Sequence, residues 1–386
     1  MNRVRPLVVP LLLALPTAVW LAPPHAPAAQ PAGKVPLIDV TDLYHPPQDP
    51  GDNFDLVAAY ALPEVDLRAV VLDTSSGFRK PVADVPGMHP DASGPRDPGF
   101  IPVMQLNFIF NRQVPCAAGP FAMMKSPEDT MLDVPAFQQQ GVELILRTLR
   151  ESRDPVEIVS FGSARPVAVA FNRAPELLAK KLRRLHLCAG ASEPGCLEWN
   201  VQLDPQAIVC LLRSTLPIAI YPCANKDGPF AYGPHNCFWK LPDLRFVEQM
   251  HPALRAYLAY AFGRSPRSDF LRAVESEAPA TWTPEQLAQS HNVWETGVWL
   301  AVADRRLVRR ADGAHRIVPA AQVRPDDTVL PNELRPCRVQ VKDNGEFSWE
   351  LTAEPTNFLI YDRGDPKQNE AAFREALPVW YGEFEP

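Results

Sequence analysis

Five aspartates lie close together near the start of the chain, in the segment LIDVTDLYHPPQDPGDNFDLVAAYAL. They are Asp39, Asp42, Asp49, Asp52 and Asp55. Carboxylate oxygens are the ligands that Ca²⁺ and Mg²⁺ prefer, and Ca²⁺ takes about six to eight oxygen ligands. Like charges this close raise one another's energy unless a cation or hydrogen bonds offset them. Any single aspartate has a local alternative, since Asp49 or Asp52 would cap a helix and Asp39 would stabilise a turn. As a group, the five aspartates indicate a divalent cation site.

The elements around the aspartates follow from the hydrophobic pattern. An apolar strand is expected over 36–40, a helix over 55–62 and a buried strand over 67–72. Further strands are expected over 156–161, 184–188 and 216–221, and they alternate with helices over 134–153, 174–185 and 204–214. Helices near 249–263 and 283–304 follow. A β-rich stretch to about 361 and a final helix over 366–376 complete the chain. The alternation predicts an α/β fold, an open, mostly parallel sheet with helices on both faces, in one large domain. Ligands of such sheets bind at the carboxyl ends of the strands, where the first aspartates lie.

The composition excludes one class of fold and argues against one class of ligand. With 44 prolines in 386 residues, a long uninterrupted helical bundle is excluded, because proline breaks helix interiors. Lysine and arginine total 38 against 45 acidic residues, a net charge of −7. A nucleic-acid surface therefore has no electrostatic support.

The first 29 residues have the features of a secretory signal peptide. Arg3 and Arg5 precede an apolar stretch that contains Pro10 and Pro16, and small residues follow it. We expect a signal peptide over 1–29, a linker over 30–35 and the domain over 36–386. Export to a periplasmic or extracellular location follows. No later apolar run reaches about 18 residues, so no stable membrane insertion is expected after the signal is removed.

The chain has seven cysteines and no CxxC pair, which argues against a zinc or thioredoxin-like site. Outside the cytoplasm disulfides can form. The candidate pairs are Cys223–Cys237 and Cys188–Cys196, because the two cysteines of each pair flank a loop rich in turn residues. The alternative is that most cysteines are small buried side chains.

Around the aspartates the sequence resembles the inosine–uridine-preferring nucleoside hydrolases. The matching motifs are the acidic strand end 39–42, the Pro50-Gly51 turn between Asp49 and Asp52, the strand 156–162, the segment 188–191, the Glu-aromatic-Asn…Asp-Pro-x-Ala pattern over 198–207, the stretch around Glu295 and the last helix after Asp365. The resemblance covers about residues 36–378, with poor matches over 79–130 and 224–290. It departs from the family where Asn53-Phe54 separates Asp52 from Asp55, which are adjacent acids in the family.

This resemblance implies a Ca²⁺ ion that binds the ribose 2′- and 3′-hydroxyls and a water. A carboxylate takes the proton of the water, and the N-glycosidic bond breaks through an oxocarbenium-like state. The metal ligands that the resemblance implies are Asp49, Asp52, Asp55, the main-chain carbonyl of Arg165 and Glu295. Asp204 is expected to be the N-cap of a helix.

The other implied roles concern the substrate. Asp49 is the candidate general base, and Asp42 competes because it lies at the strand end. Glu198 and Asn200 would hold ribose hydroxyls. The base would stack on an aromatic residue of the unmatched loops (Tyr232, Phe238, Trp239 or Trp294), although lid packing is the alternative for these rings. Trp294 stands where the family has a histidine. His291 is therefore the candidate leaving-group acid, on the same face as Glu295 if the segment is helical, and His45 is the other candidate.

Three functions stay open from the sequence. The first is an exported, Ca²⁺-dependent nucleoside hydrolase acting on a small ribosyl substrate. The second is a non-catalytic relative that binds a nucleoside or sugar. The third is an unrelated phosphohydrolase that uses Asp39, Thr41 and Asp42, but the lysine-bearing motif of such enzymes is not evident. A homo-oligomer is left open by the sequence.

Overall fold

The computed structural model describes residues 33–45, 51–75, 97–263 and 267–386. The predicted signal peptide and Asp49 lie outside the described residues. Of the predicted linker over 30–35, only residues 33–35 are described, and Val35 already begins the first strand.

A nine-stranded sheet forms the centre of the molecule, in the order β13-β12-β14-β6-β5-β4-β1-β2-β3. Its parallel strands are β1 (Val35–Thr41), β2 (Val65–Leu72), β3 (Cys116–Ala118), β4 (Val156–Ser160), β5 (Leu182–Cys188), β6 (Ile218–Tyr221) and β14 (Phe358–Asp362). Two antiparallel strands, β12 (Glu333–Val341) and β13 (Phe347–Leu351), extend one edge. The predicted open, mostly parallel sheet is confirmed.

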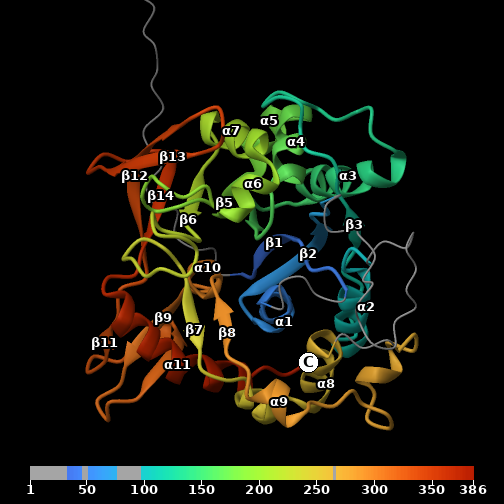
Figure 1. The fold of residues 1–386 in the computed structure, drawn as a ribbon, viewed down its shortest axis with the longest axis vertical. Coiled ribbons are helices and arrows are strands. Elements are labelled where there is room, and N and C mark those ends of the chain that lie inside the picture. The colour runs from blue at the N-terminus through green and yellow to red at the C-terminus, as the bar shows by residue number, and fades with distance from the viewer. Residues whose placement is uncertain (1–32, 46–50, 76–96, 264–266) are drawn as a thin grey trace, which may run out of the picture.

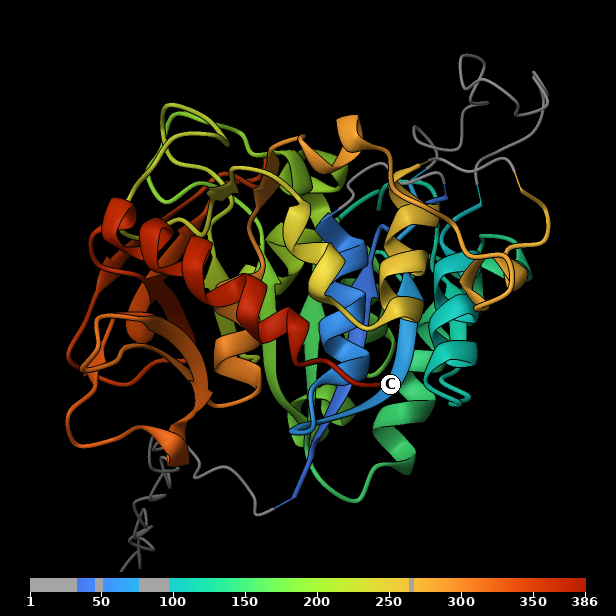
Figure 2. The ribbon, with the colours of Figure 1, turned by 90° about the horizontal axis from the view of Figure 1, so that it is seen from below.

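Helices cover both faces of the sheet (Figure 1). One face packs against α1 (Gly51–Ala61), α2 (Phe100–Ile109), α8 (Pro252–Phe262), α10 (Thr296–Val302) and α11 (Pro366–Gly382). The other packs against α3 (Ala136–Glu151), α4 (Arg165–Arg173), α5 (Pro175–Lys181), α6 (Trp199–Leu203) and α7 (Pro205–Arg213). Figure 2 shows α1, α8 and α11 on the same face.

Strand β1 explains how the acidic residues reach one of these faces. Successive side chains of a strand point to opposite faces. Ile38 and Val40 pack into the core with α3 and α4, and Leu37 packs into the core with α1 and α8. Asp39 and Thr41 therefore lie on the face that α1 covers.

Two smaller sheets lie beside the main one. The first has the order β10 (His315–Pro319), β9 (Arg305–Arg309) and β11 (Thr328–Val329), and the second pairs β7 (Trp239–Leu241) with β8 (His291–Val293). Short helices complete the described elements: α9 (Pro284–Leu287), η2 (Arg245–Gln249), η3 (Arg272–Val274) and η4 (Ala320–Gln322). Within the described ranges, no helix combines the length and apolarity that spanning a bilayer requires.

Two predicted helices are wrong in extent. The segment 283–304 is not one helix but α9, β8 and α10, because β8 pairs antiparallel with β7 and interrupts the helical path. The helix predicted over 174–185 ends at Lys181, where β5 begins its pairing with β4. In both cases hydrogen bonding to a distant strand overrides the local helical pattern.

All seven cysteines are free thiols in the structure, so neither candidate pair is bonded in it. Five of the seven are buried. This agrees with the alternative that most of them are small buried side chains.

Candidate metal centre

Three carboxylates from two helices converge on the face of the sheet that α1 covers. Asp52 and Asp55 lie one turn apart at the start of α1, and Glu295 is the N-cap residue of α10. Each offers an oxygen that lies within 4.8 Å of the other two. Their exposed fractions are only 3%, 4% and 7%. The site is therefore a buried acidic cluster, which we call the carboxylate triad.

Hydrogen bonds from β1 and from the segment around α10 orient the triad. The Thr41 hydroxyl of β1 donates to Asp52 Oδ2 over 2.8 Å. The indole N–H of Trp299 donates to Asp55 Oδ1 over 2.6 Å. The main-chain N–H of Trp294 donates to Glu295 Oε2 over 3.0 Å. Each carboxylate is therefore held in place by a neighbour.

The triad carries unfavourable electrostatics. Burial raises the pKa of Asp55 well above its ordinary value, and the nearby charges of Glu295 and Asp52 raise it further. The Trp299 hydrogen bond lowers it and offsets only part of the effect. A bound divalent cation would remove this repulsion, because it attracts all three carboxylates.

Asp39 is a fourth buried carboxylate beside the triad. It is 1% exposed, and neither of its oxygens has a hydrogen-bond partner among the described residues. Burial and the Asp52 charge raise its pKa well above the ordinary value. The sequence placed Asp39 in the group of five aspartates that indicates a cation site, but the family resemblance gave it no role as a metal ligand or catalytic residue. The sequence signal for its place beside the triad was its position on an apolar strand, two residues before Thr41 and therefore on the same face.

The donor set fits a hard divalent cation. The triad supplies closely spaced oxygens, and the unsatisfied carboxylate of Asp39 adds negative charge beside it. Oxygen ligands of this kind suit Ca²⁺ or Mg²⁺. Of the other predicted acids, Asp42 is buried directly after β1 and is not a member of the triad, and Asp49 is outside the described residues.

The side chain of Arg165 is a structural cation. Its guanidinium is fully buried and pairs with Asp204, with 2.6 Å between Nε and Oδ2. Nη1 donates to the carbonyls of Thr74 and Pro120, and Nη2 donates to that of Leu203. Asp204 also caps α7 by accepting from the N–H of Ala207, as the sequence predicted. Arg165 therefore ties together segments that follow different strands, and the metal role of its carbonyl stays a prediction.

His291 does not have the predicted relation to Glu295. It lies on β8 and not on the helix of Glu295, and its ring packs 5.7 Å from that of Phe54 and 5.6 Å from that of Phe262. Burial lowers its pKa to about 4. The imidazole is therefore neutral at pH 7, which suits packing better than proton donation to a leaving group.

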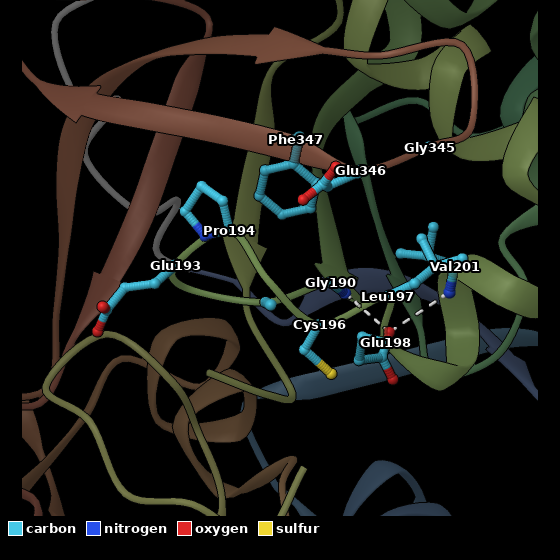
Figure 3. A pocket seen from close by; sticks show the side chains of 11 residues that line it. Gly190, Glu193, Pro194, Cys196, Leu197, Glu198, Val201, Gly345, Glu346 and Phe347 are labelled. Atoms are coloured by element: carbon cyan, nitrogen blue, oxygen red, sulfur yellow. Dashed lines mark hydrogen bonds between the residues drawn. The ribbon is translucent and has the colours of Figure 1, made fainter. Parts of the chain in front are cut away.

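Glu198 and Asn200 bind the main chain around the ends of β4 and β5. Glu198 is the N-cap of α6: Oε1 accepts from the N–H of Asn200, and Oε2 accepts from those of Gly190 and Val201. Asn200 Nδ2 donates to the carbonyls of Cys188 and Phe161. Glu198 lines a cavity of about 10 Å³, near the minimum for one water, and Figure 3 shows the side chains around it. Burial raises the pKa of Glu198 to about 7.

An aromatic cluster lies next to Glu295. Trp294 donates its indole N–H to the carbonyl of Cys223 over 2.9 Å, and its ring centroid lies 5.4 Å from that of Phe238 and 6.1 Å from that of Phe230. Phe230 is 60% exposed, so the cluster reaches the surface. Trp239, in contrast, is fully buried and donates to Thr296, so its ring is closed to a ligand.

Comparisons with known proteins agree with the resemblance. No family model matches the chain. The pyrimidine-specific ribonucleoside hydrolase RihA of Escherichia coli O127:H6 is 32% identical over 187 residues, 45% of this chain. RihA of E. coli O139:H28 is 29% identical over 195 residues. The chain spans 57% of the length of either relative.

A solved structure extends the similarity to most of the chain. The purine-preferring ribonucleoside hydrolase from Gardnerella vaginalis has a TM-score of 0.50 and 14% identity, and the match covers 90% of this chain and 99% of that one. At this identity the match establishes the fold alone. The resemblance predicted from the motifs is confirmed: in sequence over part of its length, and in fold over most of it, the chain is similar to the nucleoside hydrolases.

Proposed function

We propose that this protein is a metal-dependent hydrolase of ribosyl N-glycosidic bonds, which converts a nucleoside and water into ribose and a free base. The observation that carries the proposal is the carboxylate triad, Asp52, Asp55 and Glu295, with oxygens within 4.8 Å of one another. It lies beside the end of β1, where ligands of open α/β sheets bind. The similarity to ribonucleoside hydrolases in sequence and fold supports the same reaction.

In this proposal the triad holds a Ca²⁺ ion, with Asp49 and the Arg165 carbonyl as further ligands. A bound Ca²⁺ supplies an anchor for the ribose diol and makes a bound water more acidic. Asp42 or Asp49 accepts the proton of the attacking water. The negative charges of Asp39 and the triad stabilise the positive charge that develops on the ribose ring. Trp294 and the exposed Phe230 provide rings against which a base stacks.

We also propose that residues 1–29 direct export and that the substrate is a small nucleoside. The net charge of −7 supports a small-molecule substrate over a nucleic acid, since polyanions are repelled. The aromatic cluster beside Glu295 supports recognition of a flat ring.

A second candidate function is nucleoside or sugar binding without turnover. Two observations favour it. Both carboxylate oxygens of Glu198, which the resemblance assigns to ribose, already accept main-chain hydrogen bonds. His291, the candidate leaving-group acid, is buried and neutral.

One experiment separates the two candidates. The purified protein is incubated with inosine, uridine and p-nitrophenyl riboside, with added Ca²⁺ or with a chelator, while sugar release and nucleoside binding are measured. Release that the chelator abolishes supports the hydrolase, and chelator-sensitive binding without release supports the second candidate. Absence of both contradicts both.

Variants test whether the carboxylate triad is responsible for the calcium dependence. Asp55→Asn should abolish the calcium-dependent signal. Asp343→Asn is the matched control, because it makes the same change in a carboxylate that is 93% exposed, and it should leave the signal intact. An Asp55→Asn protein that keeps full calcium dependence contradicts the assignment of the triad.

A further inference from the structure

Trp299 is a fully buried tryptophan that contacts the carboxylate triad. It lies on α10, four residues after Glu295. Side chains four apart on a helix lie on the same face, so one short helix carries both a member of the triad and the donor to another member. The 2.6 Å bond from its indole N–H reaches Asp55 Oδ1 on α1, 244 positions away in sequence.

The surroundings of the indole hold it in one position. Its ring centroid lies 5.9 Å from that of Phe161, directly after β4. Helix α10 also approaches β14 closely, because a Cβ at Gly297 would lie 2.7 Å from the Tyr361 ring. An indole that is fully buried, packed against Phe161 and carried on a helix held close to β14 is a rigid donor.

The charge pattern gives this bond a specific consequence. Glu295 and Asp52 both repel the Asp55 carboxylate. A hydrogen bond from a neutral donor to an ionised acceptor is stronger than one between neutral groups. Trp299 therefore opposes rotation of Asp55 away from the other two carboxylates. One lone pair of Oδ1 accepts the bond, and the remaining lone pairs of Asp55 stay available to a cation.

We propose that Trp299 is a positioning residue for the cation site, which acts by orienting Asp55 before the ion binds. The proposal rests on the proposed function, in that the triad binds a divalent cation. Neighbours that orient a metal ligand typically contribute about tenfold to a hundredfold to metal affinity. Loss of the indole N–H should weaken Ca²⁺ binding by that factor.

Calorimetric titration with Ca²⁺ and the melting temperature with and without Ca²⁺ test the proposal. Trp299→Phe keeps a large aromatic ring and removes the donor. Trp380→Phe is the matched control, because Trp380 is also buried but its indole N–H has no hydrogen-bond partner among the described residues. We expect Trp299→Phe to bind Ca²⁺ about tenfold to a hundredfold more weakly, and Trp380→Phe to bind it like the unmodified protein.

A purely structural role gives a different result. It would lower the melting temperature equally with and without Ca²⁺ and leave the affinity unchanged, which overturns the proposal. Should Trp299→Phe not fold, Trp299→His keeps a ring N–H in a smaller side chain and is compared with Trp299→Leu, which has no donor. Tighter Ca²⁺ binding by the histidine variant supports the proposal, and equal binding overturns it.

Terbium luminescence separates this proposal from the proposed function. Tb³⁺ replaces Ca²⁺ at oxygen sites and luminesces when a nearby indole is excited, and we expect such a signal that Ca²⁺ displaces. Trp299→Phe should lose part of the signal, because the Trp294 indole beside Glu295 remains, while direct excitation still detects weaker Tb³⁺ binding. Absence of Ca²⁺ and Tb³⁺ binding by the unmodified protein refutes the cation site itself. Normal binding of both ions by Trp299→Phe refutes only the role of Trp299.

Discussion

Replacing Asp55 by asparagine should stabilise the cation-free protein and remove its stabilisation by calcium. Asp55 is 4% exposed and lies within 4.8 Å of two other carboxylates. An asparagine has nearly the same shape, and its amide oxygen can still accept the bond from Trp299. Its amide nitrogen can donate toward Glu295, so repulsion is replaced by a hydrogen bond.

The gain in stability expected for Asp55→Asn follows from the distance between the carboxylates. Two unit charges 4.8 Å apart repel by about 3.5 kcal/mol at an effective dielectric constant of about 20. The cation-free triad relieves part of this repulsion by taking up a proton, since the pKa of Asp55 is raised. We therefore expect a gain of about 1–3 kcal/mol at pH 7.5. For about 350 residues this corresponds to a melting temperature about 1–4 °C higher.

Calorimetric melting in EDTA and in Ca²⁺ measures both effects. The unmodified protein should melt higher in Ca²⁺, and Asp55→Asn should melt higher than it in EDTA but show no further rise in Ca²⁺. Asp343→Asn is the control, because it makes the same change in a carboxylate that is 93% exposed. It should leave the melting temperature in EDTA nearly unchanged and keep the calcium response. A less stable Asp55→Asn protein with an unchanged calcium response would refute the reasoning.

Three further predictions concern pH and buried charge. The pKa values of Asp55 and Asp39 are raised in the cation-free fold, so its stability falls as rising pH ionises them; because Ca²⁺ binding displaces these protons, the calcium-induced rise in melting temperature should be larger at pH 8 than at pH 5. Arg165→Met should lower the free energy of unfolding in urea by about 3–5 kcal/mol, because Asp204 loses its partner; a loss below about 1 kcal/mol would contradict the buried pair. Glu198 has a folded-state pKa of about 7, above its ordinary value of 4.5. Its contribution to stability is present below pH 4.5 and is lost as the pH rises through 7, so Glu198→Gln should flatten the stability profile over that range.

The sheet could be predicted from sequence because its strands have strong local signals. The apolar segments 36–40 and 67–72 became β1 and β2, because buried parallel strands are continuously apolar. The helix predicted over 283–304 was wrong because the pairing that interrupts it is not local. Its apolar residues fit a helix, but β8 gains its hydrogen bonds from β7, some fifty residues earlier. Such a pairing leaves no trace in the local pattern.

The site was predictable only in part. Asp52 and Asp55 are close because both lie in the first turns of one helix, whereas Glu295 was found through the family resemblance. Trp299 was missed because a buried tryptophan in an apolar helix has the appearance of a core residue. The ribose-binding roles of Glu198 and Asn200 came from the family resemblance and stay predictions, and in the structure both side chains hydrogen-bond to the main chain.

The clearest departure from the nucleoside hydrolase pattern, the two residues between Asp52 and Asp55, leaves the carboxylate triad intact. Positions three apart on a helix share a face, so both acids still point toward Glu295. The intervening residues contact the other helices. Asn53 accepts a hydrogen bond from Tyr257 of α8 over 2.9 Å, and the Phe54 ring packs 5.8 Å from Tyr381 of α11. The insertion thus anchors α1 to its neighbours while the triad keeps the spacing that a divalent cation requires.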